Sequence, residues 1–217
     1  QKLYLENKNI LVTAGPTLEP IDPVRYISNR SSGKMGFAIA KVAKNYGANT
    51  DLVTGPVHLT NIPQVNIIKV ETVIDMHSNI STLLDKKNYD YIFMVAAVAD
   101  YHVDRIASNK IKSSKDTMNI QLKKSPDILK AITKKSKAKV IGFALETNDG
   151  EKNALNKMKN KNLDYIVLNY ANEKNAGFDS NTNHVYLYSK TGIKKEFELD
   201  RKDRIAKLII DSIIKNE

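Results

Sequence analysis

A long segment near the start of the chain, from Gly15 to Lys34, contains the residues best suited to chemistry. Arg25 and Asn29 lie in it among three prolines that restrict the backbone, and it leads to Ser32-Gly33 near its end. Its 20 residues carry no periodic pattern and are too many for an idle connection between regular elements. A helix that begins there would present backbone N–H groups and a dipole that favour an anion. The segment therefore indicates an anion-binding or catalytic loop, with a structured surface loop as the alternative.

Three further segments contain residues suited to binding a nucleotide. Ala96-Ala97 ends an apolar run and is followed by Asp100, whose carboxylate could accept hydrogen bonds from a sugar or a base. Asn109–Lys115 is polar and basic and could fold over a phosphate; the alternative is a solvated run of charge. Lys157 and Lys161 are four residues apart and share one face of a predicted helix. That spacing suits a polyphosphate, although exposed lysines often show it.

Two common nucleotide-binding fingerprints are absent from these loops. Thr13–Thr17, after the first predicted strand, is not the G-x-G-x-x-G of dinucleotide-binding folds. Ser31–Gly36 contains a Gly-Lys pair, but Ser28 and Met35 stand where a Walker A loop requires Gly and Ser or Thr. An NAD(P)-dependent oxidoreductase is therefore disfavoured, although its strands and helices would alternate in the same way.

Apolar runs that alternate with helical patterns predict the elements that position these loops. The predicted strands are Asn9–Thr13, Thr50–Thr54, Asn66–Val70, Tyr91–Val95, Asn119–Lys123, Lys139–Ala144, Asp164–Asn169, His184–Ser189 and Lys194–Leu199. The predicted helices cover residues 32–46, 73–84, a segment that begins at Pro126-Asp127, 151–161 and 201–215. This order predicts an α/β fold with a Rossmann-like, doubly wound, mainly parallel sheet, a C-terminal β-hairpin and a closing helix. We expect residues 1–8 to be a linker remnant and residues 9–217 to form a single domain.

The composition limits the classes of protein to which the chain can belong. The net charge is +10, with 29 lysines but only five arginines. Specific DNA readers rely on arginine, so the lysine excess favours a nonspecific basic surface or a phosphate-rich ligand over a nucleic-acid-binding module. The absence of cysteine excludes disulfides, cysteine-ligated zinc and a thiol nucleophile supplied by this chain. The longest apolar run, Tyr91–Ala99, is far shorter than the ~20 residues of a membrane helix.

The segment Ala14–Gly36 as a whole closely resembles the signature of phosphopantothenoylcysteine synthetase. The likeness continues in order through Ala96–Tyr101, Lys110–Lys112, Ser125–Ile128, Gly142–Asn148 and Ala176–Ser180. It spans nearly the whole chain, and the first motif is highly specific. In most bacteria this enzyme is the C-terminal half of a bifunctional coenzyme A protein.

The resemblance implies a CTP-dependent ligase of coenzyme A biosynthesis. CTP would activate the carboxylate of 4′-phosphopantothenate as an acyl-cytidylate with release of pyrophosphate, and the amine of L-cysteine would then displace CMP. Joining a carboxylate to a triphosphate requires positive charge, backbone N–H donors and, we expect, Mg²⁺. The resemblance also implies a cytoplasmic homodimer that binds neither nucleic acid nor a membrane. The flavin would belong to a decarboxylase half to which such domains are fused, and this domain is expected to bind none.

The resemblance also implies roles for individual residues. Asn29 matches the residue that holds the acyl intermediate, with Ser32 and Gly33 as further substrate-binding residues. Arg25 matches an arginine important for the second half-reaction, and Lys110 matches a mobile-loop lysine that covers the intermediate. The implied nucleotide contacts are Met94, Val95, Ala96, Asp100, Lys110, Pro126, Asp127, Ile128, Leu129, Phe143, Lys157 and Lys161. Metal ligands are not assigned, and Ser113 departs from the family, which often has another lysine there.

Overall fold

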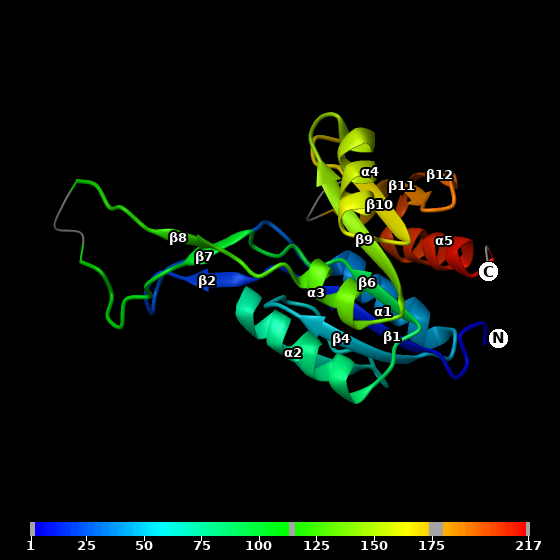
Figure 1. Ribbon diagram of the computed structural model, residues 1–217, viewed down its shortest axis with the longest axis horizontal. Coiled ribbons are helices and arrows are strands. Elements are labelled where there is room, and N and C mark those ends of the chain that lie inside the picture. Colours follow the sequence, from blue (N-terminus) through cyan, green and yellow to red (C-terminus); the bar gives the residue numbers. More distant parts are fainter. Residues whose placement is uncertain (1–2, 113–115, 174–179, 216–217) are drawn as a thin grey trace.

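The computed structural model of the chain describes residues 3–112, 116–173 and 180–215, so Ser113 and part of the motif Ala176–Ser180 lie outside the described residues. The core is one eight-stranded sheet with helices on both faces, and an arm projects from it (Figure 1). The strands of this sheet are β1 (Asn9–Ala14), β4 (Asn49–Thr54), β5 (Asn66–Lys69), β6 (Tyr91–Met94), β9 (Lys139–Glu146), β10 (Tyr165–Tyr170), β11 (Thr182–Ser189) and β12 (Lys194–Arg201). Their order across the sheet is β12-β11-β10-β9-β6-β1-β4-β5.

The sheet is parallel from β5 to β10, and the hairpin β11–β12 adds two antiparallel strands at one edge. The central strands are buried on both faces, which explains why they appear in the sequence as continuous apolar runs. Strand order, parallel pairing and the terminal hairpin confirm the predicted doubly wound α/β fold.

The helices divide the core into two layers. Helices α1 (Lys34–Asn45) and α5 (Lys202–Ile214) pack on one face of the sheet, against side chains such as Ile10 and Val12. Helices α2 (Val73–Lys86), α3 (Ile128–Lys135) and α4 (Gly150–Asn160) pack on the other face, against side chains such as Leu11. None of the helices in the described part of the chain has the length and apolar character that a membrane crossing requires.

Part of the predicted linker packs with the domain. Leu5 is buried in the same core layer as α1, and its N–H donates to the carbonyl of Tyr46 at 2.8 Å. Lys8 forms an ion pair with Asp90 at 3.0 Å. Residues 5 and 8 therefore contact the end of α1 and the segment that leads into β6.

Only one strand of the arm, Asn119–Lys123, was predicted from the sequence. The arm comprises residues 18–28, 101–112 and 116–124, and contains two small hairpins, β2 (Leu18–Pro20) with β3 (Tyr26–Ser28) and β7 (Tyr101–Val103) with β8 (Leu122–Lys124). The expected loop 15–34 thus contains a hairpin. The expected strand Asn119–Lys123 is corrected to residues 122–124, and it lies outside the main sheet. Three-residue strands are too short to show an alternating pattern in sequence.

A buried carboxylate joins the two hairpins of the arm. The side chain of Asp22 is fully buried and accepts hydrogen bonds from the backbone N–H groups of Val24 and Ile111 and from the Arg25 guanidinium. Arg25 Nη2 also donates to the carbonyl of Ile111 at 2.6 Å. The bond from Arg25 is the largest of the causes that hold the pKa of Asp22 far below its usual range, against the opposing effect of burial. At the base of the arm, Glu19 accepts the N–H of Val73 at the start of α2.

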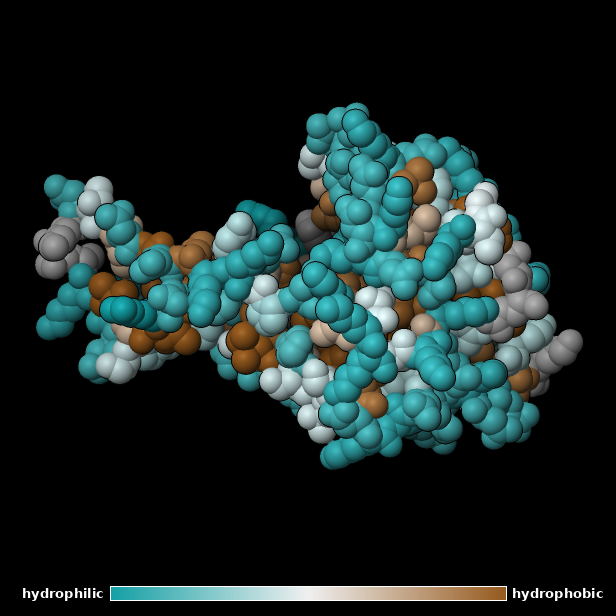
Figure 2. All heavy atoms as spheres, in the orientation of Figure 1, coloured by the Kyte–Doolittle hydropathy of each residue, from teal (hydrophilic) through white to brown (hydrophobic). Residues whose placement is uncertain are grey.

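Large apolar side chains remain exposed along the arm. Figure 2 shows hydrophobic residues gathered on this projection, away from the main body. They are Val24, Tyr26, Tyr101, Ile106, Met118 and Leu122, each between 44% and 59% exposed. We call this set the arm patch.

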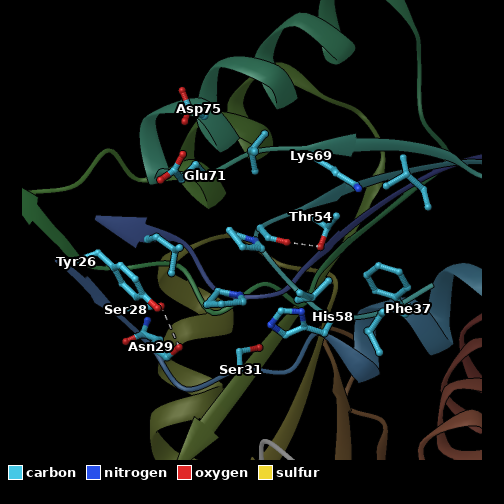
Figure 3. Close-up of a pocket in the computed structure, with 18 of the residues that line it drawn as sticks. Tyr26, Ser28, Asn29, Ser31, Phe37, Thr54, His58, Lys69, Glu71 and Asp75 are labelled. Carbon is cyan, nitrogen blue, oxygen red and sulfur yellow. Dashed lines mark hydrogen bonds between the residues drawn. The ribbon is translucent and has the colours of Figure 1, made fainter. Parts of the chain in front are cut away.

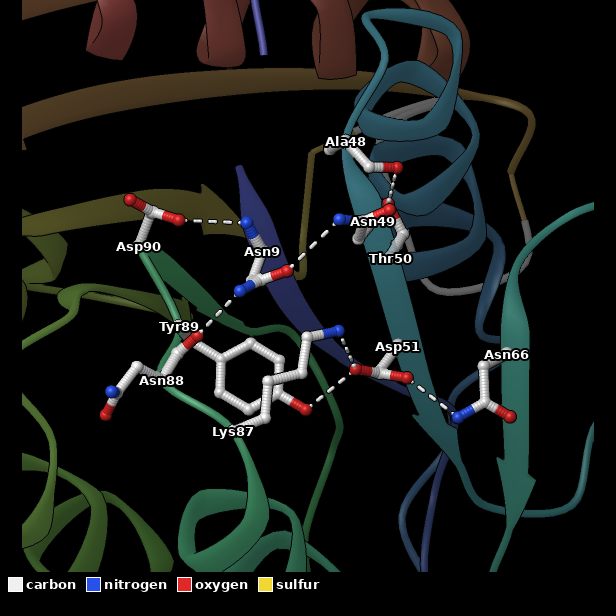
Figure 4. Close-up of polar contacts among 10 residues, drawn as sticks. All are labelled: Asn9, Ala48, Asn49, Thr50, Asp51, Asn66, Lys87, Asn88, Tyr89 and Asp90. Carbon is white, nitrogen blue, oxygen red and sulfur yellow. Dashed lines mark hydrogen bonds and ion pairs between the residues drawn. The ribbon is translucent and has the colours of Figure 1, made fainter. Parts of the chain in front are cut away.

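A polar cluster lies near the amino end of the strands, opposite to the long loops (Figure 4). Asp51 on β4 is buried and accepts hydrogen bonds from Lys87 at 2.9 Å, Tyr89 at 2.7 Å and Asn66 at 2.7 Å. Burial alone would raise the pKa of Asp51, but these three donors outweigh it and lower the pKa. The same burial, together with the Asp51 carboxylate, raises the pKa of Tyr89 above its usual range.

The depressed pKa of Asp51 predicts a specific acid dependence of stability. Because the folded-state pKa lies below the unfolded value of about 3.9, Asp51 stabilises the fold above that pH and loses the effect as the pH falls through the folded-state pKa. Asp51→Asn should lower the free energy of unfolding by about 2 kcal/mol at neutral pH, and by less at pH values below about 3. Urea unfolding of both proteins across this range measures the difference, and a difference independent of pH would contradict the assignment.

The Asp22–Arg25 pair predicts how the arm is held together. Arg25→Ala should speed backbone amide exchange in residues 104–112 by about tenfold, because Ile111 loses its contact with the guanidinium and Asp22 loses its main donor. Exchange measured by mass spectrometry reports this, with the exposed Arg105→Ala in the same arm as the matched control. Equal exchange in wild type and Arg25→Ala would show that the pair does not hold the arm.

Candidate functional site

The loops after β1 and β6 meet at the point where the sheet changes direction. From β1 the chain proceeds to β4 and β5 on one side, and from β6 to β9 and β10 on the other. Such a switch point leaves a crevice at the carboxyl ends of the strands, where ligands bind. Thr13 Oγ1 accepts the N–H groups of Val95 at 3.0 Å and Ala96 at 3.1 Å, and Ala97 N–H donates to the carbonyl of Gly15 at 2.9 Å. These bonds form the floor of the crevice.

A cavity of about 450 Å³ lies in this crevice, which we call the switch cavity. It brings together eight of the residues predicted from the sequence, namely Asn29, Ser32, Gly33, Val95, Ala96, Asp100, Phe143 and Lys157. The N–H groups of Val95 and Ala96 are already bonded to Thr13, so a ligand can use only the carbonyls of these two residues. Met94 is buried beneath the cavity as a core side chain.

One wall of the switch cavity is the start of α1. The helix follows Gly33, which has a positive φ of 74°, and no side chain caps its first turn or supplies an acidic residue there. A Cβ on Gly36 would lie 2.6 Å from the Cβ of Ala14, so only glycine allows this helix to lie so close to β1. The result is an uncapped helix start beside Ser32, with Lys34 also lining the cavity. This wall has the donors and the dipole that an anion requires.

Asn29 is held at the boundary of the switch cavity by two backbone carbonyls. Its Nδ2 donates to Ala97 at 3.2 Å and to Val98 at 3.0 Å. The carboxamide is thereby attached to the loop that follows β6, although Asn29 belongs to the segment after β3. This contact between distant segments sets the position of a neutral polar group beside the anion-binding wall.

The two predicted lysines of α4 have different environments. Lys157 Nζ donates to the carbonyl of Phe143 at 2.8 Å, and burial lowers the pKa of Lys157 against the opposing effect of Glu146 and Asp100. Lys161 forms an ion pair with Asp127, which also caps α3 by accepting the N–H of Lys130. Only Lys157 lines the switch cavity.

Several other predicted residues do not line the switch cavity in this chain. Five of them lie around the start of α3, where Ile128 is buried in the core. They are Pro126, Asp127, Ile128, Leu129 and Lys161. Arg25 and Lys110 lie on the arm, where Arg25 is bound to Asp22 and Lys110 is exposed next to Ile111. Conversely, Asn169, Asn183 and Lys202 line the cavity and were not found from the sequence, because nothing in their local pattern distinguishes them from other polar residues.

A second and larger cavity, of about 1390 Å³, adjoins the first (Figure 3). Its lining includes residues at and after the ends of β4 and β5, and one residue of the arm: Thr54, His58, Lys69, Glu71 and Tyr26. The segment 29–31 lines both cavities. Two different molecules could therefore occupy the cavities and approach one another at Asn29.

A separate cluster of titratable groups lies on the terminal hairpin. The two ring nitrogens of His184 face Glu173 and Glu196. Burial alone would lower the pKa of His184, but the two carboxylates outweigh it and raise the pKa. Glu198 is also close enough for His184, Glu196 and Glu198 to present ligand atoms to one cation, but none of them lines either cavity described above.

Comparison with known proteins places this geometry in a family. A family model described as the DNA/pantothenate metabolism flavoprotein C-terminal domain matches residues 5–216. The Coenzyme A biosynthesis bifunctional protein CoaBC of Escherichia coli (strain K12) is 43% identical over 216 residues, which are 97% of this chain and 52% of that protein. CoaBC of Bacillus subtilis (strain 168) is 38% identical over 211 residues, or 96% of this chain and 52% of that protein. The chain thus spans about half the length of the curated relatives it matches.

Solved structures agree with this result. A crystal structure of the C-terminal domain of CoaBC matches with a TM-score of 0.83 and 38% identity, covering 99% of this chain and 97% of that one. A Cab2 mutant in complex with phosphopantothenate-cysteine matches with a TM-score of 0.80 over 97% of this chain and 86% of that one, but at 18% identity it shows the shared fold alone. The chain belongs to the family of DNA/pantothenate metabolism flavoprotein C-terminal domains.

Proposed function

We propose that the chain is a CTP-dependent phosphopantothenate–cysteine ligase of coenzyme A biosynthesis, acting in the cytoplasm. The observation that carries the proposal is the switch cavity, where Asn29, the uncapped start of α1 and Lys157 surround one space. The identity to CoaBC and to the structure of its C-terminal domain supports the same assignment. Those relatives are bifunctional, and we assign the flavin of the family description to the half that this chain does not cover.

In the first step, two anions must be brought together. A carboxylate oxygen of 4′-phosphopantothenate attacks the α-phosphorus of CTP, and the bond to the β-phosphate oxygen breaks to release pyrophosphate. The start of α1 supplies N–H donors, and Lys34, Lys157 and Lys202 supply positive charge around the cavity. The phosphates and the carboxylate can therefore approach despite their repulsion.

Asn29 is proposed to hold the acyl group between the two steps. A neutral carboxamide does not compete with the lysines for the phosphates, and it can donate to the acyl carbonyl when one N–H turns away from the backbone carbonyl that it bonds without substrate. Its attachment to the carbonyls of Ala97 and Val98 fixes its position before substrate binds. In the second step, the cysteine amine attacks the acyl carbon, the acyl–oxygen bond to CMP breaks and the amine proton is lost.

The residues of the switch cavity fit a Mg²⁺ ion that accompanies the triphosphate. Mg²⁺ prefers oxygen ligands, and the cavity is lined by the carboxylate of Asp100 and the carboxamides of Asn169 and Asn183. The Oδ1 atom of Asn183 is buried without a hydrogen-bond partner in the described part of the chain. When bound, the ion would neutralise charge on the departing pyrophosphate.

We further propose that the active form is a homodimer assembled through the arm. The arm patch is a group of exposed apolar side chains on a projection with little core of its own. Arg25 and Lys110 are on this arm and away from the switch cavity of their own chain, so a second copy of the chain would bring them to a site. A dimer therefore accounts both for the arm patch and for the position of these two residues.

The ligase assignment predicts a defined order of products. With phosphopantothenate present, CTP should yield pyrophosphate before cysteine is added, and cysteine should then release CMP; ATP should be a poorer substrate. Asn29→Ala should leave CTP affinity within about twofold but lower the overall rate by about 100-fold or more, because the contact to the acyl group is lost whereas the anion-binding wall and the lysines are kept. Pyrophosphate release, CMP release and calorimetric CTP binding measure these quantities. Wild-type turnover in Asn29→Ala would show that the residue is misassigned, and NADPH binding without CTP binding would favour an oxidoreductase.

The dimer predicts that two inactive variants can complement each other. Arg25→Ala and Asn29→Ala should each be inactive alone, and their mixture should recover about a quarter of wild-type activity after subunit exchange if Arg25 completes the partner's site.

Ile106→Glu in the arm patch should shift the protein to a monomer in light scattering and abolish activity, because it places a charge in the contact. A monomeric wild type with full activity would overturn this proposal.

A further inference from the structure

One buried polar atom of the switch cavity has no hydrogen-bond partner in the described part of the chain. Asn183 is 4% exposed and lines the cavity, and its Oδ1 atom is buried without a partner. Buried acceptors in folded proteins are almost always bonded, so an isolated one indicates a missing partner. The switch cavity, which Asn183 lines, is the nearest open space, and the carboxamide must turn toward it for the oxygen to meet a partner there.

The position of Asn183 on its strand also indicates a ligand. Asn183, Val185 and Leu187 alternate along β11 and are all buried toward the face that α1 and α5 cover. The last two are apolar core residues, whereas Asn183 carries a carboxamide at the cavity end of the same row. The register of β11 with β12 shifts between Asn183 and Val185, but the extra residue lies on β12, so the alternation along β11 is kept.

The surroundings of Asn183 carry positive charge. Lys202 begins α5 directly after the strand that pairs with β11, lines the same cavity and is 7% exposed, with its Nζ donating to the carbonyl of Ser180 at 2.6 Å. Helix α5 packs against α1, whose start forms the anion-binding wall with Lys34. Phosphate groups are therefore the ligand atoms expected at this end of the cavity.

Phosphate oxygens cannot satisfy Asn183 Oδ1 directly, because both atoms are acceptors. A divalent cation between them satisfies both, and Mg²⁺ takes amide carbonyl oxygens and phosphate oxygens as ligands. We propose that Asn183 binds the Mg²⁺–triphosphate end of the nucleotide through its carboxamide oxygen, directly or through one water of the ion. The inference rests on the proposed function and adds to it a binding residue and the orientation of the nucleotide, with its triphosphate toward the starts of α1 and α5.

The test compares nucleotide binding with and without Mg²⁺. Asn183→Leu has the same branched shape and no oxygen, and should weaken calorimetric CTP binding by about tenfold or more in Mg²⁺ while leaving binding in EDTA unchanged. Asn183→Asp keeps an oxygen but adds a charge, so it should weaken binding in EDTA and increase the gain that Mg²⁺ produces. Asn88→Leu, an exposed asparagine at the opposite end of the strands, is the control and should match wild type.

Two further measurements test other roles of Asn183. Binding of tripolyphosphate tests whether Asn183 contacts the base or ribose instead of the metal ion, and the unfolding temperature tests whether it has a structural role. Magnesium tripolyphosphate has no base or sugar, so Asn183→Leu should weaken its binding as much as that of CTP. If CTP binding falls but tripolyphosphate binding does not, the oxygen accepts a hydrogen bond from the base or ribose and the proposal is wrong. Without ligand, Asn183→Leu should unfold at a higher temperature than wild type, because an unsatisfied buried acceptor is removed. A lower unfolding temperature would indicate a structural role instead.

The outcomes also separate this inference from the proposed function. If wild type binds CTP and releases pyrophosphate but Asn183→Leu binds like wild type, only the role of Asn183 is overturned. If wild type binds magnesium tripolyphosphate but not CTP, the proposed function fails, and the tripolyphosphate comparison still decides the role of Asn183. If wild type binds neither, both proposals fail.

Discussion

The approach of the loop after β1 to the loop after β6 is the contact on which the rest of the site depends. Thr13 Oγ1 accepts two backbone N–H groups of the second loop, and Gly15 accepts a third. These bonds form where the two halves of the sheet diverge, so the crevice has a closed floor and open walls. The start of α1 becomes one wall, and residues 143–145 of β9 become another. Asn29 is attached to this floor through the carbonyls of Ala97 and Val98.

Buried polar groups are hydrogen-bonded to different extents at the two ends of the sheet. At the amino end, Asp51 is surrounded by three donors, and its burial is compensated within the chain. At the carboxyl end, the Oδ1 atom of Asn183 is buried without a partner in the described part of the chain. A hydrogen-bond network whose members are all bonded stabilises the fold. A buried acceptor without a partner lowers the free energy of unfolding, and a ligand that bonds to it removes this cost. The buried polar group that stabilises the fold and the one proposed to bind a ligand thus lie at opposite ends of the sheet.

The arm extends the chain beyond its own core. Its internal contacts are polar and specific, with Asp22 at the centre and Glu19 attaching the base to α2. The six apolar side chains of the arm patch are instead exposed, which costs free energy in water unless another surface covers them. Arg25 is a charged residue of the arm that the family resemblance links to catalysis, yet its contacts in this chain are to the arm itself. Such a division between a rigid inner face and an uncovered outer face suits a segment that completes another subunit.

Local sequence determined the layers of this protein. Buried parallel strands such as Tyr91–Met94 require unbroken apolar runs, and helices on their faces require apolar residues at helical spacing, so both patterns could be found without coordinates. The motif that includes Asn29 and Ser32-Gly33 predicted a functional loop; these residues line the switch cavity, and their roles stay predictions. Strands β2, β3 and β7 of the arm escaped detection because three residues are too few to show an alternating pattern. The neighbours of each residue were decided only by tertiary structure: Lys157 lines the cavity while Lys161 pairs with Asp127. Burial and partner choice depend on segments that meet only after folding, and for this reason the unsatisfied oxygen of Asn183 has no signal in the sequence.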